Sequence, residues 1–507
     1  MYQGNHLAAA LRKGSAGRER NHFATAVPGG RSWSYGDLWT SAEKAASALI
    51  SAGLQPGDRV AVQVEKSLEA LALYLGTIIA GGVFLPLNTA YTAAELSHFL
   101  QNAGPRIFVC DPAQEAALRP MADEAGVAAM FTLDGKGAGS FAEAIAASAP
   151  ITAPVPRGPD DLAAILYTSG TTGRSKGAML THANLSSNAA ALCDLWRFTA
   201  KDVLIHALPI FHTHGLFVAV NVTLIAGSSL IYHSKFDARA ILADFGRATV
   251  LMGVPTFYTR LLELPELAAE RLSGMRLFVS GSAPLLAETH KAWQRKTGRA
   301  ILERYGMTET CMNTSNPYDG VRKPGTVGLP LPGVEVRITD ADGKPLPQGE
   351  IGGIEVRGPN VFKGYWQLPE QTAAELRADG FFITGDLGLI DADGYLSIIG
   401  RSKDLIISGG FNIYPKEIEL AVDQIEGVDE SAVFGLPHPD FGECVAVAIV
   451  RSKGAQIEGP DIGAALSARL AKFKHPRHVF FLDALPRNTM GKVQKNVLRE
   501  KFKSQAT

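Results

Sequence analysis

The chain has 507 residues, a formal net charge of −1 and a hydrophobic fraction of 46%. At roughly 150 residues per domain this length predicts about three folding units, and the balanced composition excludes collagen-like, coiled-coil and disordered proteins. Binding to nucleic acid needs a basic excess that a near-neutral chain lacks, so we expect no nucleic-acid partner. The composition therefore indicates a globular protein of several domains.

Helices and strands alternate through the first half of the chain. Helical spacing over residues 34–53 is followed by a β-rich run at 57–65, and a helix near 69–80 leads to a strand at 81–88. The alternation returns between residues 234 and 306. Because strands separated by helices of this length form parallel sheets, the pattern predicts two α/β subdomains within one large N-terminal domain.

The pattern changes in the second half. Alternating apolar and polar residues at 333–358 predict antiparallel strands, and Asp393-Gly394 predicts the turn of a further hairpin. From residue 401 onward, helices and strands alternate in a compact α+β region. We therefore expect an α/β protein with a large N-terminal domain of two α/β subdomains plus a β-rich segment (1–400), and a small, mobile α+β C-terminal domain (401–507).

The sequence shows no sign of export or membrane insertion. The four cysteines lie far apart without metal-binding spacing, and free thiols without a recognisable leader predict a cytoplasmic protein. Two uncharged stretches, 70–94 and 204–234, are interrupted by glycine, proline or histidine. We interpret both as core and expect no membrane contact, since a spanning helix needs about 20 mostly apolar residues in sequence.

The segment at 168–177 (TSGTTGRSKG) follows an apolar strand at 163–167 and carries the strongest functional signal. Its glycines let backbone N–H groups turn inward, its hydroxyls add donors and its lysine adds charge, which together suit a phosphate-binding loop. The residue order differs from GxxxxGK[ST], which disfavours a Walker-type NTPase. A helix capped by Thr181 is expected next. The candidate nucleotide-binding residues of the loop are Thr168, Ser169, Gly170, Thr171, Thr172, Gly173 and Lys176.

Six segments, in this order along the chain, resemble the motifs of the adenylate-forming superfamily, which includes acyl-CoA synthetases, peptide-synthetase adenylation domains and luciferases. They are the phosphate loop, LPIFHTHG at 208–215, YGMTE at 305–309, TGDLG at 384–388, the hinge-like segment GRSKDLIISGGFNIYPKEIE at 400–419 and PRNTMGK at 486–492. The resemblance spans essentially the whole chain. It implies activation of a carboxylic acid by ATP as an acyl-adenylate, with Mg²⁺ bound beside the phosphates, and transfer of the acyl group to coenzyme A.

The resemblance implies roles for individual residues of the nucleotide site. Positive charge and hydrogen-bond donors are needed there, because an anionic acid must approach an anionic triphosphate. The implied residues are Thr308 as a phosphate contact, Glu309 as the Mg²⁺ ligand, Tyr305, Ser282 and Ala283 around the adenine, and Asp386 with Arg401 at the ribose. Of these, Thr308 and Glu309 are expected to act in catalysis.

The resemblance also implies that the C-terminal domain takes part in both steps. Lys492 would contact the attacking carboxylate and the α-phosphate during adenylate formation. Rotation about Lys403 would then place Gly409 and Gly410 along the channel for the thiol arm of coenzyme A. Acylation would remove the charge of Lys492, so a lysine acetyltransferase and a deacetylase are candidate partners. Lys495 is expected at the surface.

The residue before YGMTE points to the acid substrate. Arg304 would be costly in an acyl pocket unless it met an anion, and its planar guanidinium fits a carboxylate in a two-point contact. An Arg304 that faces the pocket therefore predicts a dicarboxylate. An Arg304 that points outward or pairs with Glu303 would predict nothing about the acid.

The segments around Arg304, together with LIHALPIFHTHGLF at 204–217 and VLMGVPTFYTRLL at 250–262, resemble those of malonyl-CoA synthetases. This resemblance implies malonate as the acid and methylmalonate as a second substrate, since one added methyl group changes binding by only about 1–3 kcal/mol. The candidate substrate-binding residues are Arg304, His212, Ser282 and Arg260, with His212 also a catalytic candidate, while His206 and His214 are expected to be structural.

Three other functions stay open at this point. An aryl- or medium-chain fatty-acyl-CoA ligase would share the chemistry and differ in its acid pocket. A monooxygenase of the luciferase kind and a non-catalytic nucleotide-binding protein would share the fold. The presence of Lys492, Glu309 and Asp386 argues against a non-catalytic protein.

Overall fold

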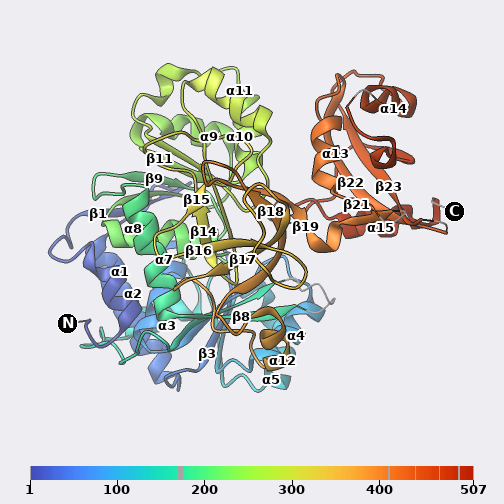
Figure 1. Cartoon of the computed structure of the whole chain (residues 1–507). Helices are drawn as coiled ribbons and strands as arrows, with labels where there is room; N and C mark the ends of the chain where they lie inside the picture. The colour runs from blue at the N-terminus through green and yellow to red at the C-terminus, as the bar shows by residue number, and fades with distance from the viewer. Residues whose placement is uncertain are drawn as a thin grey trace. The chain divides into compact units, whose positions relative to one another are not determined.

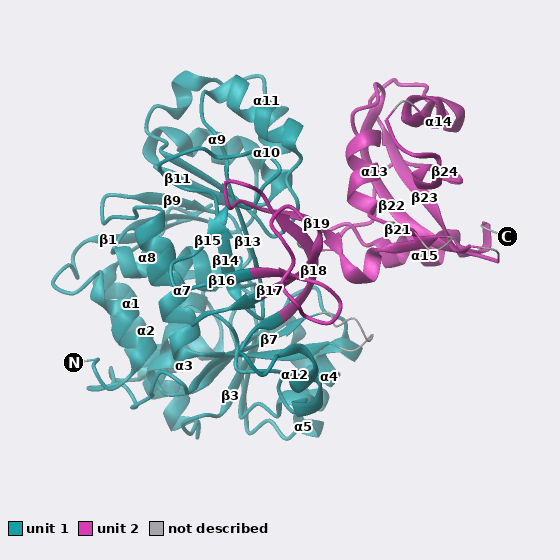
Figure 2. Cartoon of the chain, in the orientation of Figure 1, with its two compact units in different colours: residues 1–336, 356–382 teal, residues 337–355, 383–507 magenta. Residues whose placement is uncertain are grey.

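The computed structural model describes residues 2–168, 175–408, 411–439, 441–467, 469–488 and 491–505, without the side chain of Asn412. These residues form two compact units: unit 1 holds residues 1–336 and 356–382, and unit 2 holds residues 337–355 and 383–507 (Figure 2). The predicted domain boundary between residues 400 and 401 remains a prediction. The predicted site residues outside the described residues are Ser169, Gly170, Thr171, Thr172, Gly173, Gly409 and Gly410.

One sheet of unit 1 has its strands in the order β6-β5-β3-β4-β7-β8, and all neighbours are parallel except β7 and β8. Figure 1 shows α2 beside α3 and α4 beside α5 around this sheet. The strands are β3 Arg59–Gln63, β4 Val83–Pro86, β5 Ile107–Cys110, β6 Ala129–Thr132, β7 Leu162–Thr168 and β8 Lys176–Thr181. The helices are α2 Tyr35–Ser51, α3 Leu68–Ile79, α4 Ala93–Ala103, α5 Glu115–Glu124 and α6 Ser140–Ala147.

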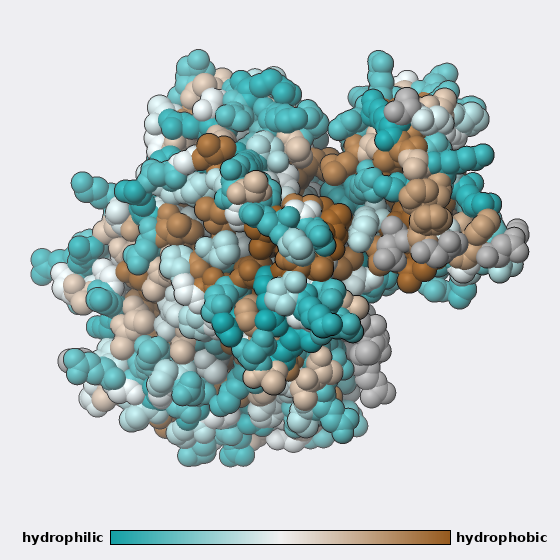
Figure 3. Space-filling view, in the orientation of Figure 1, coloured by the Kyte–Doolittle hydropathy of each residue, from teal (hydrophilic) through white to brown (hydrophobic). Residues whose placement is uncertain are grey.

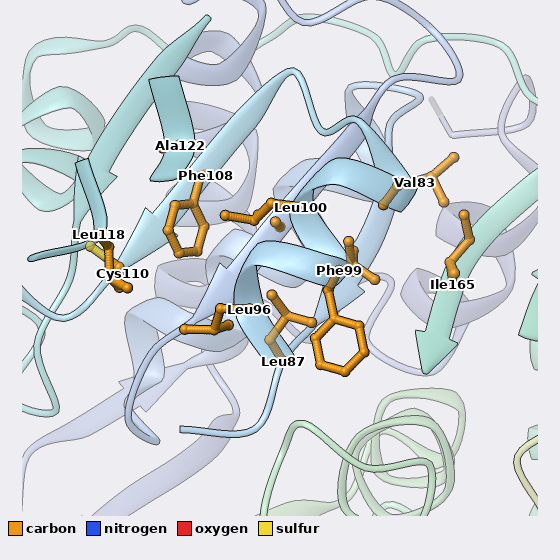
Figure 4. Close-up of a cluster of buried hydrophobic side chains, with 13 residues drawn as sticks. Val83, Leu87, Leu96, Phe99, Leu100, Phe108, Cys110, Leu118, Ala122 and Ile165 are labelled. Atoms are coloured by element: carbon orange, nitrogen blue, oxygen red, sulfur yellow. The ribbon is translucent and has the colours of Figure 1, made fainter. Parts of the chain in front are cut away.

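Local sequence explains where α4 begins and ends. The Thr92 side chain accepts a hydrogen bond from the backbone N–H of Glu95, and the backbone N–H of Thr92 donates one to the Glu95 carboxylate, so the first turn is capped from both directions. The helix ends at Gly104, whose φ of 54° is a left-handed conformation that glycine adopts without steric cost. Between these caps, the apolar face of α4 meets the sheet. Figure 4 shows Phe99 and Leu100 among the side chains of this core.

The second sheet of unit 1 has its strands in the order β15-β14-β13-β12-β11-β9-β10-β1-β2. Strands β12 and β13 run parallel with Ser280 opposite Glu303, so the next residues, Gly281 and Arg304, follow side by side. The strands are β1 His22–Val27, β2 Ser32–Ser34, β9 Val203–His206, β10 Ser229–His233, β11 Val250–Gly253, β12 Leu277–Ser280, β13 Leu302–Met307, β14 Cys311–Ser315 and β15 Leu329–Pro330. The remaining helices of unit 1 are α1 His6–Lys13, α7 His182–Leu195, the π-helix His214–Val220, α8 Asn221–Ala226, α9 Ala238–Asp244, α10 Pro255–Leu262, α11 Ala287–Thr297 and α12 Pro369–Glu375.

The structure confirms the two predicted α/β subdomains and the predicted cap of α7, where Thr181 accepts a hydrogen bond from the backbone N–H of Asn184. It also shows a strand that was not predicted, between the predicted phosphate loop and that helix. Residues 176–181 form β8, which pairs antiparallel with β7 and sets Thr168 opposite Lys176. Lys176 is therefore held in a strand, which the sequence pattern did not predict.

Unit 2 contains most of the predicted β-rich segment and the α+β region. Its first sheet has the order β16-β17-β18-β19, and the turn between β18 and β19 contains Asp393-Gly394, as predicted. Its second sheet has the order β21-β20-β23-β22, with β24 parallel to β23. These strands are β16 Glu335–Thr339, β17 Gly352–Arg357, β18 Phe382–Ile390, β19 Leu396–Arg401, β20 Ile406–Ser408, β21 Phe411–Ile413, β22 Val428–His438, β23 Gly442–Arg451 and β24 His478–Leu482, and the helices are α13 Pro415–Val422, α14 Gly459–Ser467 and α15 Lys495–Phe502. The predicted α/β fold class is confirmed, although β23 was not predicted.

The uncharged stretches belong to the interior of unit 1. The stretch at 70–94 contributes most of α3 and all of β4, which are buried throughout. No helix among the described residues is both long enough and apolar enough to span a bilayer. All four cysteines are buried with unpaired thiols. In the space-filling view, hydrophilic side chains cover much of the visible periphery of unit 1 (Figure 3).

Candidate active site

The side chain of Arg304 is buried inside unit 1. The residue is 3% exposed, and neither Nε nor Nη2 of its guanidinium has a hydrogen-bond partner among the described residues. Arg304 therefore does not point outward. Among the described residues Arg304 also forms no ion pair with its neighbour Glu303, whose Oε1 lies 3.3 Å from Nδ1 of His290. Of the two sequence hypotheses, the structure favours an arginine that faces an internal site.

A buried guanidinium without a counter-ion is electrostatically costly. Burial lowers the pKa of Arg304, because the low-dielectric surroundings disfavour its charged form. The cost disappears when an anion binds in direct contact, since a buried charge is tolerated once it is paired and hydrogen-bonded. Contact with a negatively charged group would therefore remove an electrostatic cost that the described residues leave uncompensated at Arg304.

His214 joins this cluster, although the sequence hypothesis made it structural. It is the first residue of the π-helix, it is 1% exposed, and its Nδ1 lies 3.2 Å from Oγ of Ser282. Burial, followed by the charges of Arg304 and His212, holds the pKa of His214 well below its usual range, so its ring is neutral. Its Nε2 has no hydrogen-bond partner in the described part of the chain. His214 can therefore offer an N–H to a ligand while Ser282 donates to Nδ1.

Ser282 has an unusual backbone conformation. Its φ is 69°, in the left-handed region that residues with a side chain seldom adopt. It follows β12 and precedes Ala283, and both side chains are partly exposed. The strained turn directs the Ser282 hydroxyl to His214, and strain of this kind is concentrated at functional sites.

His206 is structural, as predicted. Its Nε2 lies 2.7 Å from the carbonyl oxygen of Gly215 and must donate to it, so Nδ1 carries the lone pair. Nζ of Lys66 lies 2.6 Å from this Nδ1 and donates in turn. The hydrogen bonds from Lys66 to His206 and from His206 to Gly215 thus hold the first turn of the π-helix, which contains His214.

The two remaining acid-site candidates lie in different surroundings. His212 precedes the π-helix, is partly buried, and is close enough to His214 for its charge to lower the pKa of that ring. Arg260 is exposed on α10. The structure therefore brings together Arg304, His212, His214 and Ser282, and leaves Arg260 outside the buried group.

The carboxylate of Glu309 lies in a second polar cluster of unit 1. Its Oε1 accepts a hydrogen bond from Oγ1 of Thr168 at 3.3 Å and lies 3.1 Å from the hydroxyl of Tyr365. The same hydroxyl lies 2.7 Å from Oε2 of Glu375, and Oε1 of Glu375 lies 2.8 Å from Nζ of Lys176. The structure thus assembles three predicted residues, Glu309, Thr168 and Lys176, and adds Tyr365 and Glu375.

The chemistry of this cluster suits a cation at Glu309. A phenol has one proton, so Tyr365 donates to only one carboxylate at a time, and the shorter distance assigns that proton to Glu375. Burial and the two carboxylates raise the pKa of Tyr365, which keeps it protonated. An oxygen of Glu309 then faces the phenol oxygen, and a cation bound by Glu309 would relieve the repulsion between them.

The described residues contain no group of three or more His, Cys, Asp or Glu side chains able to hold a metal by themselves. This is compatible with Mg²⁺, which commonly takes one or two carboxylates and completes its shell with water and phosphate oxygens. Thr308, beside Glu309, is partly buried, and Tyr305, three residues before Thr308, is buried. The YGMTE segment therefore presents its polar groups near the end of β13.

Unit 2 holds the candidate ribose residues. Asp386 is 4% exposed, and its Oδ1 lies 2.6 Å from Nε of Arg401. The two residues are directly opposite on β18 and β19, which explains why positions 15 residues apart meet. The backbone N–H of Asp386 also donates to Oγ1 of Thr384. Asp386 is therefore a carboxylate held in one orientation within unit 2.

The predicted hinge and catalytic lysines of unit 2 are both exposed. Lys403 lies in a short helical turn after β19, and Lys492 lies in the segment before α15. The backbone N–H of Lys492 donates to Oδ1 of Asn488, and the N–H of Asn488 donates back to the Lys492 carbonyl, which fixes the base of this segment. Lys495 is not a solvated surface residue as predicted, because its Nζ lies 2.6 Å from Oε1 of Glu419.

Sequence reasoning missed His214, Tyr365 and Glu375. His214 was assigned to the core because histidine in an apolar run usually satisfies a local acceptor, and only the turn at Ser282 reveals otherwise. Tyr365 and Glu375 lie far along the chain from Glu309, in a segment without a recognised motif. Their contact with Glu309 runs through the hydroxyl of Tyr365, and such a tertiary contact leaves no signal in the local sequence.

Comparison with known proteins identifies the family. The AMP-binding enzyme model matches residues 13–366, and the AMP-binding enzyme C-terminal domain model matches residues 417–492. A malonate–CoA ligase of Arabidopsis thaliana is 34% identical over 94% of this chain and 86% of its own, and a feruloyl-CoA synthase of an Amycolatopsis species is 37% identical over 94% and 96%. The crystal structure of ATP-bound MatB from Rhodopseudomonas palustris is 58% identical, with a TM-score of 0.97 over 99% of this chain and 100% of its own. The chain therefore belongs to the AMP-binding enzyme family, the adenylate-forming proteins that its six motifs resemble.

Proposed function

We propose that this chain is an AMP-forming CoA ligase whose acid substrate is malonate, with methylmalonate as a second substrate. The observation that carries the proposal is the buried guanidinium of Arg304, whose Nε and Nη2 find no hydrogen-bond partner in the residues that the structure describes. It fits the second carboxylate of a short dicarboxylate, which a fatty or aromatic monocarboxylic acid lacks. The 34% sequence identity to the malonate–CoA ligase of Arabidopsis thaliana, which extends over 94% of this chain, supports the same acid.

The reaction has two steps with different requirements. In the first, a carboxylate oxygen of malonate bonds to the α-phosphorus of ATP and pyrophosphate leaves. In the second, the thiol sulfur of coenzyme A bonds to the acyl carbon, loses its proton and displaces AMP. Both steps develop negative charge on oxygen, so positioned cations and donors lower their barriers.

The acid site would be divided between recognition and orientation. Arg304 binds the carboxylate of malonate that does not react. His214, with its tautomer set by Ser282, donates a further hydrogen bond to the acid, and His212 lies beside them. Since these groups are buried or partly buried, water competes little for the same contacts.

The nucleotide would use the cluster around Glu309 and the residues of unit 2. Glu309 would hold Mg²⁺, which neutralises charge on phosphate oxygens when bound, with Thr308 and Thr168 as hydroxyl contacts. Tyr305 and Ala283 would line the adenine, and Asp386 would accept hydrogen bonds from the ribose. Lys492 would act in the first step and Lys403 would be the hinge between the two steps.

AMP formation with a panel of acids tests the proposal. With ATP, Mg²⁺ and coenzyme A present, malonate and methylmalonate should support AMP formation, whereas acetate, benzoate and octanoate should be poor substrates. Sulfoacetate belongs in the panel because a sulfoacetate–CoA ligase of Cupriavidus necator is 35% identical over 96% of this chain. The proposal fails if octanoate or benzoate outperforms malonate.

The variant Arg304→Leu tests the observation behind the proposal. It should weaken selection for malonate by about 3–5 kcal/mol, the usual effect of removing one partner of a buried ionic pair. The KM for ATP should change little. Equal losses with malonate and acetate would mean that Arg304 does not read the second carboxylate.

A further inference from the structure

Gly281 and Arg304 are neighbours across two parallel strands. Ser280 at the end of β12 pairs with Glu303 of β13, so Gly281, the first residue after β12, comes beside Arg304, the next residue of β13. Residues in register on adjacent strands direct their side chains to the same face of the sheet. A side chain at position 281 would therefore enter the space beside Arg304.

The guanidinium of Arg304 occupies that space. A Cβ atom placed on Gly281 would lie 2.3 Å from Cζ of Arg304, 2.5 Å from Nε and 2.5 Å from Nη1. Ordinary van der Waals contact begins at 3.4 Å. Even the smallest side chain at 281 would thus require the guanidinium to move by about 1 Å.

The backbone does not by itself require glycine at this position. The φ of Gly281 lies outside the left-handed range, so alanine could adopt the same backbone conformation. The backbone N–H of Gly281 donates to the carbonyl oxygen of Gly253 on the neighbouring strand, which holds the chain in place. The feature that distinguishes glycine here is the absence of a side chain.

A methyl group at 281 would displace the guanidinium more readily than the backbone. Within the described part of the chain Nε and Nη2 of Arg304 make no hydrogen bond, so these two nitrogens do not hold the guanidinium against the push. The contacted atoms are also at the far end of a flexible side chain. Displacement should therefore change stability little and move the charge away from its position.

We infer that Gly281 is a specificity-determining residue, which admits the Arg304 guanidinium to the acid site and so selects a substrate with a second anionic group. This inference rests on the proposed function, because it assigns to Arg304 the second carboxylate of malonate. Gly281 itself offers the substrate no charge. It acts as a positioning residue through Arg304.

The test is a double-mutant cycle on positions 281 and 304. The variants are Gly281→Ala, Arg304→Ala and the double variant, with kcat/KM measured for malonate and acetate and KM measured for ATP. Gly281→Ala should lower kcat/KM for malonate by about 100-fold, as expected for a displacement of about 1 Å at a binding contact, and leave the ATP KM within about twofold. In the Arg304→Ala background the same change should cost less than about twofold.

A matched control and a rescue variant complete the cycle. Gly246→Ala adds a methyl group at an exposed glycine with open space around its Cβ and an ordinary φ, and should change none of these values. Arg304→Lys in the Gly281→Ala background removes the branched guanidinium and should recover part of the malonate activity. Equal losses on Gly281→Ala in both backgrounds, or an equal rise in the ATP KM, would overturn the inference.

Crystal structures of the unsubstituted chain and Gly281→Ala separate this inference from the proposed function. A displaced guanidinium in the variant supports the packing argument whichever acid the enzyme prefers, and an unmoved one overturns it. The acid panel on the unsubstituted chain decides the substrate independently. A preference for octanoate with a displaced guanidinium would refute malonate and would leave the control of Arg304 by Gly281 standing.

Discussion

The ammonium nitrogen of Lys176 lies 2.8 Å from Oε1 of Glu375, which ties the strand after the predicted phosphate loop to the end of α12. The lysine side chain is 7% exposed and its nitrogen also lies 4.7 Å from the centre of the Tyr365 ring. Its charge is therefore already paired within unit 1. Any phosphate that Lys176 binds must compete with this carboxylate.

This competition predicts that Glu375→Gln strengthens nucleotide binding. Removing the negative charge should lower the KM for ATP about fivefold, which corresponds to about 1 kcal/mol for a partly exposed ion pair. The KM for the acid should not change. Pyrophosphate release at varied ATP concentration measures the effect, with Glu370→Gln as a control on the exposed face of the same helix. An unchanged or higher ATP KM would mean that Lys176 does not contact phosphate.

The hydroxyl of Tyr365 sets the surroundings of Glu309, so Tyr365→Phe should disturb metal binding. Loss of the phenol oxygen removes the repulsion that a cation on Glu309 would relieve, and we expect the Mg²⁺ concentration for half-maximal activity to rise about tenfold, equivalent to about 1.4 kcal/mol. The KM for malonate should remain within about twofold. Tyr2→Phe removes a hydroxyl that donates to Glu43 at 2.6 Å elsewhere in unit 1, and should leave the Mg²⁺ dependence unchanged. A Tyr365→Phe enzyme with normal Mg²⁺ dependence would argue against Glu309 as the metal ligand.

Lys492→Ala should separate the two chemical steps. If Lys492 stabilises the first step alone, adenylate formation should fall by about 100-fold or more, whereas thioester formation from supplied malonyl-adenylate should stay near its original rate. Rapid-quench measurement of each step provides the test. Lys453→Ala, at an exposed lysine of the same unit, is the control. Equal loss in both steps would contradict the role assigned to Lys492.

The buried carboxyl group of Asp423 should make the stability of the protein depend on pH. Burial raises its pKa from 3.8 to about 6, although Ser431 donates to its Oδ1 at 2.6 Å. Because the folded state favours the protonated form, this group contributes stability below the unfolded pKa, and the contribution is lost as the pH rises through about 6.

Asp423→Asn should therefore stabilise the protein at pH 8, by at most about 3 kcal/mol in free energy of unfolding, and have little effect near pH 4. Denaturation curves at the two pH values check the sign. The exposed Asp429→Asn is the matched control. A larger gain at pH 4 than at pH 8 would show that the ionised form is the one favoured by folding.

The elements that the sequence predicted are those with strong local determinants. The helix α7 was predicted because Thr181 is a good cap, and the β18–β19 turn because Asp393-Gly394 favours one. By contrast, β8 was missed because the six residues from Lys176 to Thr181 lie between a glycine-rich loop and a helix cap, and their pairing with β7 is a tertiary contact.

The candidate acid site could be predicted in part, because a buried arginine is best explained by an anion that pairs with it. Burial of an arginine without an anion is costly, so an Arg304 facing the pocket favours an acid with a second negative group, whereas its identity alone left the outward-facing alternative open. His214 has several physical uses, and its place in the cluster depends on the strained turn at Ser282 and on the π-helix. Neither feature is a property of a local sequence pattern.

The left-handed backbone of Ser282 lowers the stability of the fold, while its hydroxyl serves the recognition of the acid. Holding a residue with a side chain in that conformation costs about 1–2 kcal/mol relative to glycine. Glycine at 282 would therefore give a more robust protein, but one whose His214 has no hydroxyl partner to fix its tautomer. Variants selected only for thermostability should therefore often carry glycine at 282, and these enzymes should discriminate less sharply among acids.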